Sequence, residues 1–115
     1  MLTIKLVRDR IPEIMRRNGV RPLLSVSEKK NILHWLTKKL VEEAEEARTA
    51  ETRTDLIEEL ADILEVIEAI QRNLKVSKTE VNKVRLKKLR ERGGFKKRIL
   101  LNEDKPSPHL PIHSQ

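Results

Sequence analysis

A single amphipathic helix with a charge on its apolar side constrains the fold of this chain most. Over residues 54–72 the apolar side chains recur at α-helical spacing and form one wide stripe. Glu59 projects into this stripe between Leu60 and Val66, and Asp62 lies one turn further at the same edge. A carboxylate on a buried helix face is unfavourable unless something pairs with it, so we expect Glu59 to have a partner.

A second acidic pair of the same kind precedes it. Residues 27–49 predict a long helix that begins near Ser27, and Glu43 and Glu46 lie at the edge of its apolar stripe. The polar connection before the next helix is short, which favours antiparallel neighbours. We therefore expect four carboxylates to converge on one seam: Glu43, Glu46, Glu59 and Asp62. The other glutamates of the two helices face solvent (Glu42, Glu45, Glu58, Glu65 and Glu68).

The remaining elements complete an all-α fold. Residues 11–19 predict a short helix with Pro12 in its first turn, and residues 77–94 predict a fourth helix that begins at a capping box and ends at two glycines. We expect an antiparallel bundle of four main helices, two of them long, over residues 1–101, with a flexible tail over 102–115. The wide apolar arcs exceed what a monomer covers, which favours completion of the bundle by dimerisation.

Composition narrows the compartment and the partners. The chain has no Cys, which excludes disulfides and thiolate metal sites, and no apolar run or signal pattern that indicates a membrane or export. We therefore expect a soluble cytoplasmic protein. Residues 75–105 hold 12 Lys/Arg against 4 Asp/Glu, so this basic third indicates a polyanion, either nucleic acid or nucleotide phosphates.

Paired carboxylates on facing helices suit hard divalent cations, because Mg²⁺ takes oxygen ligands together with substrate phosphate. We expect Glu43, Glu46, Glu59 and Asp62 to bind one or two Mg²⁺ ions, with Mn²⁺ as the alternative metal. The competing interpretation is that these residues form ordinary solvated helix faces. A metal held in this way lowers the pKa of a bound water, which can then attack a substrate phosphate. Of the four carboxylates, Glu46, with Glu43 beside it, is the candidate to orient or deprotonate that water.

The spacing of these carboxylates also resembles a known motif. Glu43-x-x-Glu46, twelve intervening residues and Glu59-x-x-Asp62 look like the metal motif of the all-α nucleoside triphosphate pyrophosphatases. That superfamily includes MazG-like proteins, dimeric dUTPases and phosphoribosyl-ATP pyrophosphohydrolases. The resemblance implies a Mg²⁺-dependent hydrolase that releases pyrophosphate from a nucleoside triphosphate, often in a house-cleaning role, and a homodimer or tetramer.

Further stretches carry the same resemblance. The flanks in residues 39–46 and 55–62 match, and residues 5–13 and 92–99 are similar to a small MazG-like, phosphoribosyl-ATP pyrophosphohydrolase-like branch. The resemblance covers residues 4 to about 101. The two outer stretches favour a general nucleoside triphosphate over the phosphoribosylated substrate of the histidine pathway, and they leave the base and the sugar open.

A triphosphate also needs cations beside its metals, and the chain offers several candidates. Each of these has a simpler interpretation as surface charge. The sole Trp is a candidate to stack on a nucleobase, although a Trp at a helix edge also suits a core or a subunit interface. The candidate substrate-binding residues are Lys5, Arg8, Trp35, Lys39, Arg92, Lys97 and Arg98.

Two functions of other classes compete with the enzyme. The first is a non-enzymatic helical protein that binds nucleic acid through its basic third, although this region has no interleaved aromatic residues for base stacking. The second is a regulatory module that binds a nucleotide and a metal without turnover. Pyrophosphate release that requires Mg²⁺ separates the enzyme from both alternatives.

Overall fold

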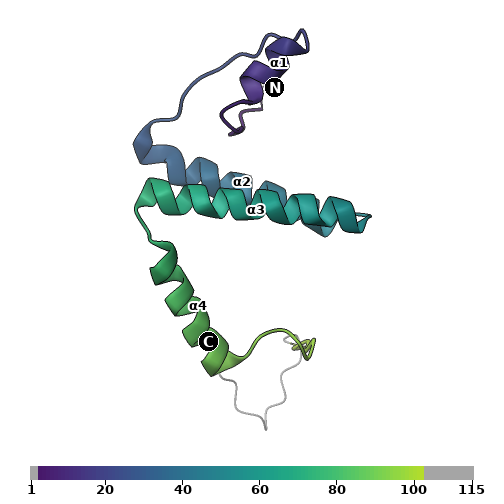
Figure 1. Cartoon of the computed structure of the whole chain (residues 1–115), viewed down its shortest axis with the longest axis vertical. Helices are drawn as coiled ribbons and strands as arrows, with labels where there is room; N and C mark the ends of the chain where they lie inside the picture. Colours follow the sequence, from purple (N-terminus) through teal and green to yellow (C-terminus); the bar gives the residue numbers. More distant parts are fainter. Residues whose placement is uncertain (1–2, 103–115) are drawn as a thin grey trace. The chain divides into compact units, whose positions relative to one another are not determined.

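Every regular element that the structure describes is helical, which confirms the all-α class for residues 3–102 (Figure 1). The structure is a computed structural model. Its elements are α1 (Ile11–Arg17), the 3₁₀ turn η1 (Lys29–Asn31), α2 (Ile32–Arg48), α3 (Arg53–Leu74) and α4 (Lys78–Arg92). None of these helices combines the length and the apolar character needed to cross a bilayer.

The described chain separates into two compact units between Val81 and Asn82. The first unit holds α1, α2 and α3, and α4 begins in it and continues into the second. One domain over 1–101 stays a prediction, as do the four-helix bundle and its dimer. The expected tail over 102–115 lies outside the described residues apart from Asn102.

The two long helices α2 and α3 lie side by side as a hairpin, the arrangement that their short connection predicts (Figure 1). Thr52 caps α3, since its hydroxyl oxygen accepts a hydrogen bond from the Asp55 backbone N–H at 3.0 Å. Leu36 of α2 and Val66 of α3 are the buried apolar side chains of the described residues. The core of the first unit is therefore the seam between these two helices.

The start of α2 differs from the prediction at Ser27. The Ser27 hydroxyl donates to the Glu28 carbonyl at 2.9 Å and caps nothing. Glu28 has an extended backbone (φ −67°, ψ 148°), so the helix cannot pass through it, and the turn η1 precedes a helix that begins only at Ile32. The expected helix is thus five residues shorter at its N-terminal end, which leaves the acidic pair on α2 unaffected.

The start and stop signals of the two shorter helices, α1 and α4, act as predicted. Pro12 lies in the first turn of α1, and Gly19 follows its end with a left-handed φ of 81°. At the start of α4 the Glu80 backbone N–H donates to the Ser77 hydroxyl oxygen at 3.0 Å, and Gly93 ends the helix with a φ of 79°.

Candidate metal centre

The hairpin brings three glutamates together at its seam. One carboxylate oxygen each from Glu43, Glu46 and Glu59 lies within 4.8 Å of the other two. Glu43 and Glu46 are one turn apart on α2, and the reversal of the chain places Glu59 of α3 opposite them. Glu43 is buried at 6% exposure, Glu59 is half-buried and Glu46 is exposed. The site thus has a closed side and an open side.

Two buried carboxylate oxygens of this cluster have no polar partner. The Oε2 atoms of Glu43 and Glu59 are buried and have no hydrogen-bond partner. Desolvation of Glu59, together with the adjoining carboxyl groups of Glu43 and Glu46 and their charge, raises the pKa of Glu59 from its ordinary 4.5 to about 7. Glu59, held this close to two other carboxyl groups, therefore resists ionisation unless a positive charge joins the cluster.

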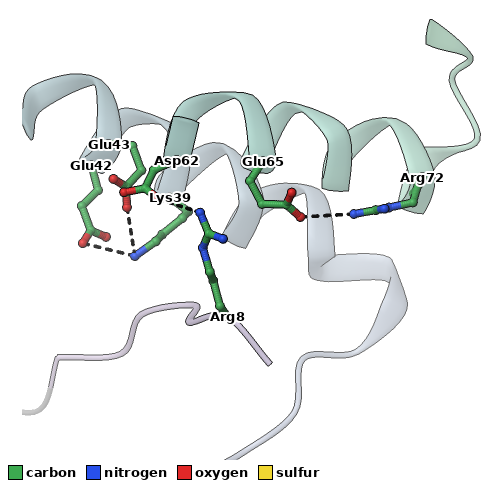
Figure 2. Close-up of polar contacts among 7 residues, drawn as sticks. All are labelled: Arg8, Lys39, Glu42, Glu43, Asp62, Glu65 and Arg72. Atoms are coloured by element: carbon green, nitrogen blue, oxygen red, sulfur yellow. Dashed lines mark hydrogen bonds and ion pairs between the residues drawn. The ribbon is translucent and has the colours of Figure 1, made fainter. Parts of the chain in front are cut away.

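One lysine reaches the cluster from its edge. Lys39 Nζ lies 3.4 Å from Glu43 Oε1 and 3.4 Å from Glu42 Oε1, as Figure 2 shows. Lys5 Nζ lies 3.8 Å from the same Glu42 oxygen. Within residues 3–102, neither Glu46 nor Glu59 forms an ion pair. Of the three clustered glutamates, only Glu43 therefore has a cation beside it. That cation, the ammonium of Lys39, is shared with Glu42 outside the cluster.

Asp62 does not join the other three carboxylates. Its Oδ1 accepts a hydrogen bond from Arg8 Nη2 at 2.5 Å, in an ion pair between α3 and the N-terminal segment (Figure 2). The segment before α1 passes close to this turn of α3 and brings a guanidinium within reach. The structure thus brings three of the four expected carboxylates together and pairs the fourth with a cation.

A cavity of about 660 Å³ begins beside the cluster and lies between the hairpin and the N-terminal residues 6–9. Glu43, Asp62, Arg8 and Lys39 line its charged end. Leu36 and Val66 line its middle, and Glu65, Arg72 and Asn73 line its other part. The sequence did not predict this cavity, because a hollow depends on the path of a segment without helical periodicity. Glu65, expected to face solvent, has a side chain that is 45% exposed; it also lines the cavity and pairs with Arg72 at 3.2 Å (Figure 2).

The other candidate substrate residues lie elsewhere. Trp35 does not line the cavity; its ring makes an edge contact with His34 (centroids 5.1 Å apart) and has Lys38 Nζ 5.4 Å from its centroid. The three candidates of the C-terminal stretch belong to the second unit and are exposed (Arg92, Lys97 and Arg98). Base stacking by Trp35 and phosphate binding by these three cations stay predictions.

No protein-family model, curated protein or solved structure matches the chain. The resemblance to the all-α nucleoside triphosphate pyrophosphatases therefore has no support beyond the residues that carry it.

Proposed function

We propose that this protein is a Mg²⁺-dependent nucleoside triphosphate pyrophosphohydrolase that releases a nucleoside monophosphate and pyrophosphate. One observation carries the proposal: three clustered carboxylates keep two buried oxygens without a partner, in a chain that has 25 Lys and Arg. A divalent cation held by the cluster would compensate its buried carboxylate oxygens. The donors are all carboxylates, which suits Mg²⁺, with Mn²⁺ as the alternative, better than a soft metal.

The residues fit such a metal. Glu43, Glu46 and Glu59 would hold it, and Asp62 stands close by on the same helix as Glu59, engaged with Arg8. When bound, the cation supplies positive charge to the phosphates and acidifies water at the site. The sequence resemblance indicates a house-cleaning role towards non-standard nucleotides, and the absence of Cys favours the cytoplasm as its compartment.

The chain's own residues divide the remaining work. Glu46 is the exposed member of the cluster and takes a proton from the attacking water. Lys39 and Arg8 at the charged end of the cavity bind phosphate oxygens and neutralise charge as it moves to the leaving group. The water oxygen bonds to the α-phosphorus, the bond from that phosphorus to the bridging oxygen breaks, and pyrophosphate leaves.

The test is a panel of nucleoside triphosphates incubated with Mg²⁺ or with EDTA, with pyrophosphate as the readout. We expect EDTA-sensitive release from the wild-type chain. In Glu59→Gln, release falls by at least about a hundredfold, because removal of a ligand exceeds the loss seen on removal of a group that only orients one. Glu58→Gln is the matched control, since Glu58 is the exposed neighbour on the same helix and lies outside the cluster. Undiminished turnover in Glu59→Gln rejects the metal assignment.

The same panel separates the competing functions. Nucleotide binding that requires Mg²⁺ without pyrophosphate release supports a regulatory module. Salt-sensitive binding to DNA or RNA, with neither of the other signals, supports the nucleic-acid protein. The described residues from Asn82 onward are exposed and rich in Lys and Arg, which makes this assay necessary.

We also propose that a second copy covers the apolar face of the hairpin. Leu56, Leu60 and Leu64 follow one another at four-residue spacing on α3, on the side away from the cavity-lining Val66 and Ala69, and they are between 41% and 66% exposed. Two such faces packed together would form the four-helix bundle of a homodimer. Light scattering should give twice the chain mass for the wild type and the monomer mass for Leu60→Lys/Leu64→Lys, with Glu58→Lys as the dimeric control.

A further inference from the structure

The cavity beside the cluster is elongated along the hairpin. Glu43 of α2 and Asp62 of α3 line it at one end, and Ile32 and Asn73 line it eleven residues away on the same two helices. Eleven residues of α-helix span about 16 Å. The hollow therefore continues well past the carboxylates, further than a metal and its phosphates need.

Its chemistry changes along this length. The charged end carries Arg8 and Lys39 beside the acids. The middle is apolar, with Leu36 and Val66 buried beneath it and the half-buried Leu6 and Val7 of the N-terminal segment across from them. Ala69 lines this apolar stretch with only a methyl group, so a larger side chain at this position would fill the hollow.

The far end is polar again. Arg72 and Asn73 offer a guanidinium and an amide, and Asn73 uses its side-chain N–H to bond the Ala69 carbonyl, which leaves its Oδ1 free to accept. Arg72 is held by Glu65 at 3.2 Å (Figure 2). An apolar slot that ends in hydrogen-bonding groups suits a flat heterocycle whose faces are apolar and whose edge is polar.

We propose that this cavity binds the nucleoside part of the substrate. The base lies in the apolar slot near Ala69, the edge of the base meets Arg72 and Asn73, and the phosphates extend to Arg8, Lys39 and the carboxylates. This inference rests on the proposed function, and it adds the place in the fold and the residues that hold the nucleoside. A volume of about 660 Å³ falls within the range of small-molecule sites.

The first experiment fills the slot. Ala69→Leu places extra methyl groups in the cavity, and Ala61→Leu makes the same change at an exposed position of α3 that does not line it. Calorimetry with Mg²⁺ measures binding of nucleoside triphosphates and of inorganic tripolyphosphate to the full chain. We expect Ala69→Leu to weaken nucleotide binding by at least about tenfold, the effect of a few misfitted methylenes. Tripolyphosphate binding should change less than about twofold, and Ala61→Leu should change neither.

The outcomes separate this inference from the proposed function. If the wild-type chain binds neither ligand in a Mg²⁺-dependent way, both the proposed function and the nucleoside site are rejected. If it binds tripolyphosphate as tightly as nucleotides, or if Ala69→Leu weakens both ligands equally, only the nucleoside site is rejected. Thermal unfolding of each variant shows whether it is folded before binding is compared.

A second measurement needs no substitution. The Ala69 methyl group, labelled with carbon-13, reports by NMR on whatever enters the slot of the wild-type protein. We expect its resonance to shift on addition of a Mg²⁺–nucleoside triphosphate, through the ring current of the base, and to stay in place with Mg²⁺–tripolyphosphate. An unchanged resonance with saturating nucleotide would overturn the proposal.

Discussion

Two glutamates on the same helix, Glu59 and Glu68 of α3, have opposite electrostatic surroundings. Lys78 Nζ lies 2.6 Å from Glu68 Oε1, and this hydrogen bond and charge lower the pKa of Glu68 below its ordinary value. Glu59 faces two other carboxyl groups across the seam, and desolvation together with those groups raises its pKa to about 7. The helix and the residue type are the same, so the difference comes from the groups that each side chain meets in space.

The comparison shows which partner Glu59 lacks. Several acidic residues of the hairpin have a cation of the chain beside them, such as Arg48 at Glu45 and Arg72 at Glu65, whereas acids without one, such as Asp55 and Glu58, are exposed to water. In the part of the chain that the structure describes, Glu46 and Glu59 have none, although cations outnumber acids by seven over the full sequence. Glu59 is half-buried against two other carboxyl groups and has no cation of its own, so a cation from outside suits it, which is the physical content of the proposed metal centre.

The largest effect should come from making Glu59 resemble Glu68. Glu46→Lys puts an ammonium at the exposed side of the cluster, where it pairs with Glu59 and removes a ligand. We expect pyrophosphate release to fall by at least about a hundredfold. The pKa of Glu59 should fall from about 7, and the metal-free protein should melt at a higher temperature than the wild type.

The matched control is Glu58→Lys, which adds the same charge to an exposed position outside the cluster. It should retain activity and leave the pKa of Glu59, followed by NMR of the labelled carboxyl group, near its wild-type value. If both lysine variants lose activity equally, bulk charge rather than the cluster controls the reaction.

A smaller loss is expected where an acid has its cation already. Arg8→Gln removes the partner of Asp62 and a candidate phosphate ligand together. We expect kcat/KM for Mg²⁺–nucleotide to fall about tenfold to a hundredfold, the contribution of a charge-assisted hydrogen bond. Calorimetric affinity for Mg²⁺ alone should hold or increase, because Asp62 then lacks a competing cation.

Arg10→Gln serves as its control. Arg10 lies on the same segment but pairs locally with Glu13 at 3.3 Å and does not line the cavity. Equal losses in both variants would show that the N-terminal segment contributes only general positive charge, and Arg8 would lose its assigned role.

The acidic residues of the hairpin show which parts of the site can be predicted from sequence patterns and which cannot. Helical spacing and a short connection were enough to place Glu59 opposite Glu43 and Glu46, because both constraints are local and regular. The pairing of Asp62 with Arg8 could not be predicted from the sequence, because it depends on where the irregular segment around Arg8 crosses α3. The same holds for the cavity, which exists only because that segment lies over Leu36, Val66 and Ala69.

The helix boundaries give the same lesson on a smaller scale. Gly19 and Gly93 ended their helices as predicted, because a left-handed φ is a backbone property that glycine adopts without strain. Ser27 failed as a cap, because a hydroxyl can serve a neighbouring carbonyl as readily as a helix N–H, and the extended Glu28 decided between them.

The raised pKa of Glu59 predicts an effect of pH on stability. Between pH 4.5 and about 7 the folded state holds a proton on Glu59 that the unfolded state has released, so stability falls as pH rises through this window. The melting temperature of the metal-free protein should therefore drop across it. Glu59→Gln should flatten this drop, and saturating Mg²⁺ should do the same for the wild type. A drop of equal size in Glu59→Gln would assign the effect to other groups.

The smallest effect should come from the opposite member of the comparison. Lys78→Gln returns the pKa of Glu68 towards its ordinary value, because the hydrogen bond and charge that lower it are lost. A lowered pKa contributes stability above about 4.5 that is lost as pH falls, so the variant should melt slightly below the wild type at pH 7, and this difference should shrink towards pH 3. The difference should stay within about two degrees, because the pair is exposed to water and salt, and 0.5 M NaCl should reduce it. This pH slope is opposite in sign to that of Glu59. A destabilisation of Lys78→Gln that is as large at pH 3 as at pH 7 would mean that Lys78 acts by packing at the start of α4 rather than through the charge of Glu68.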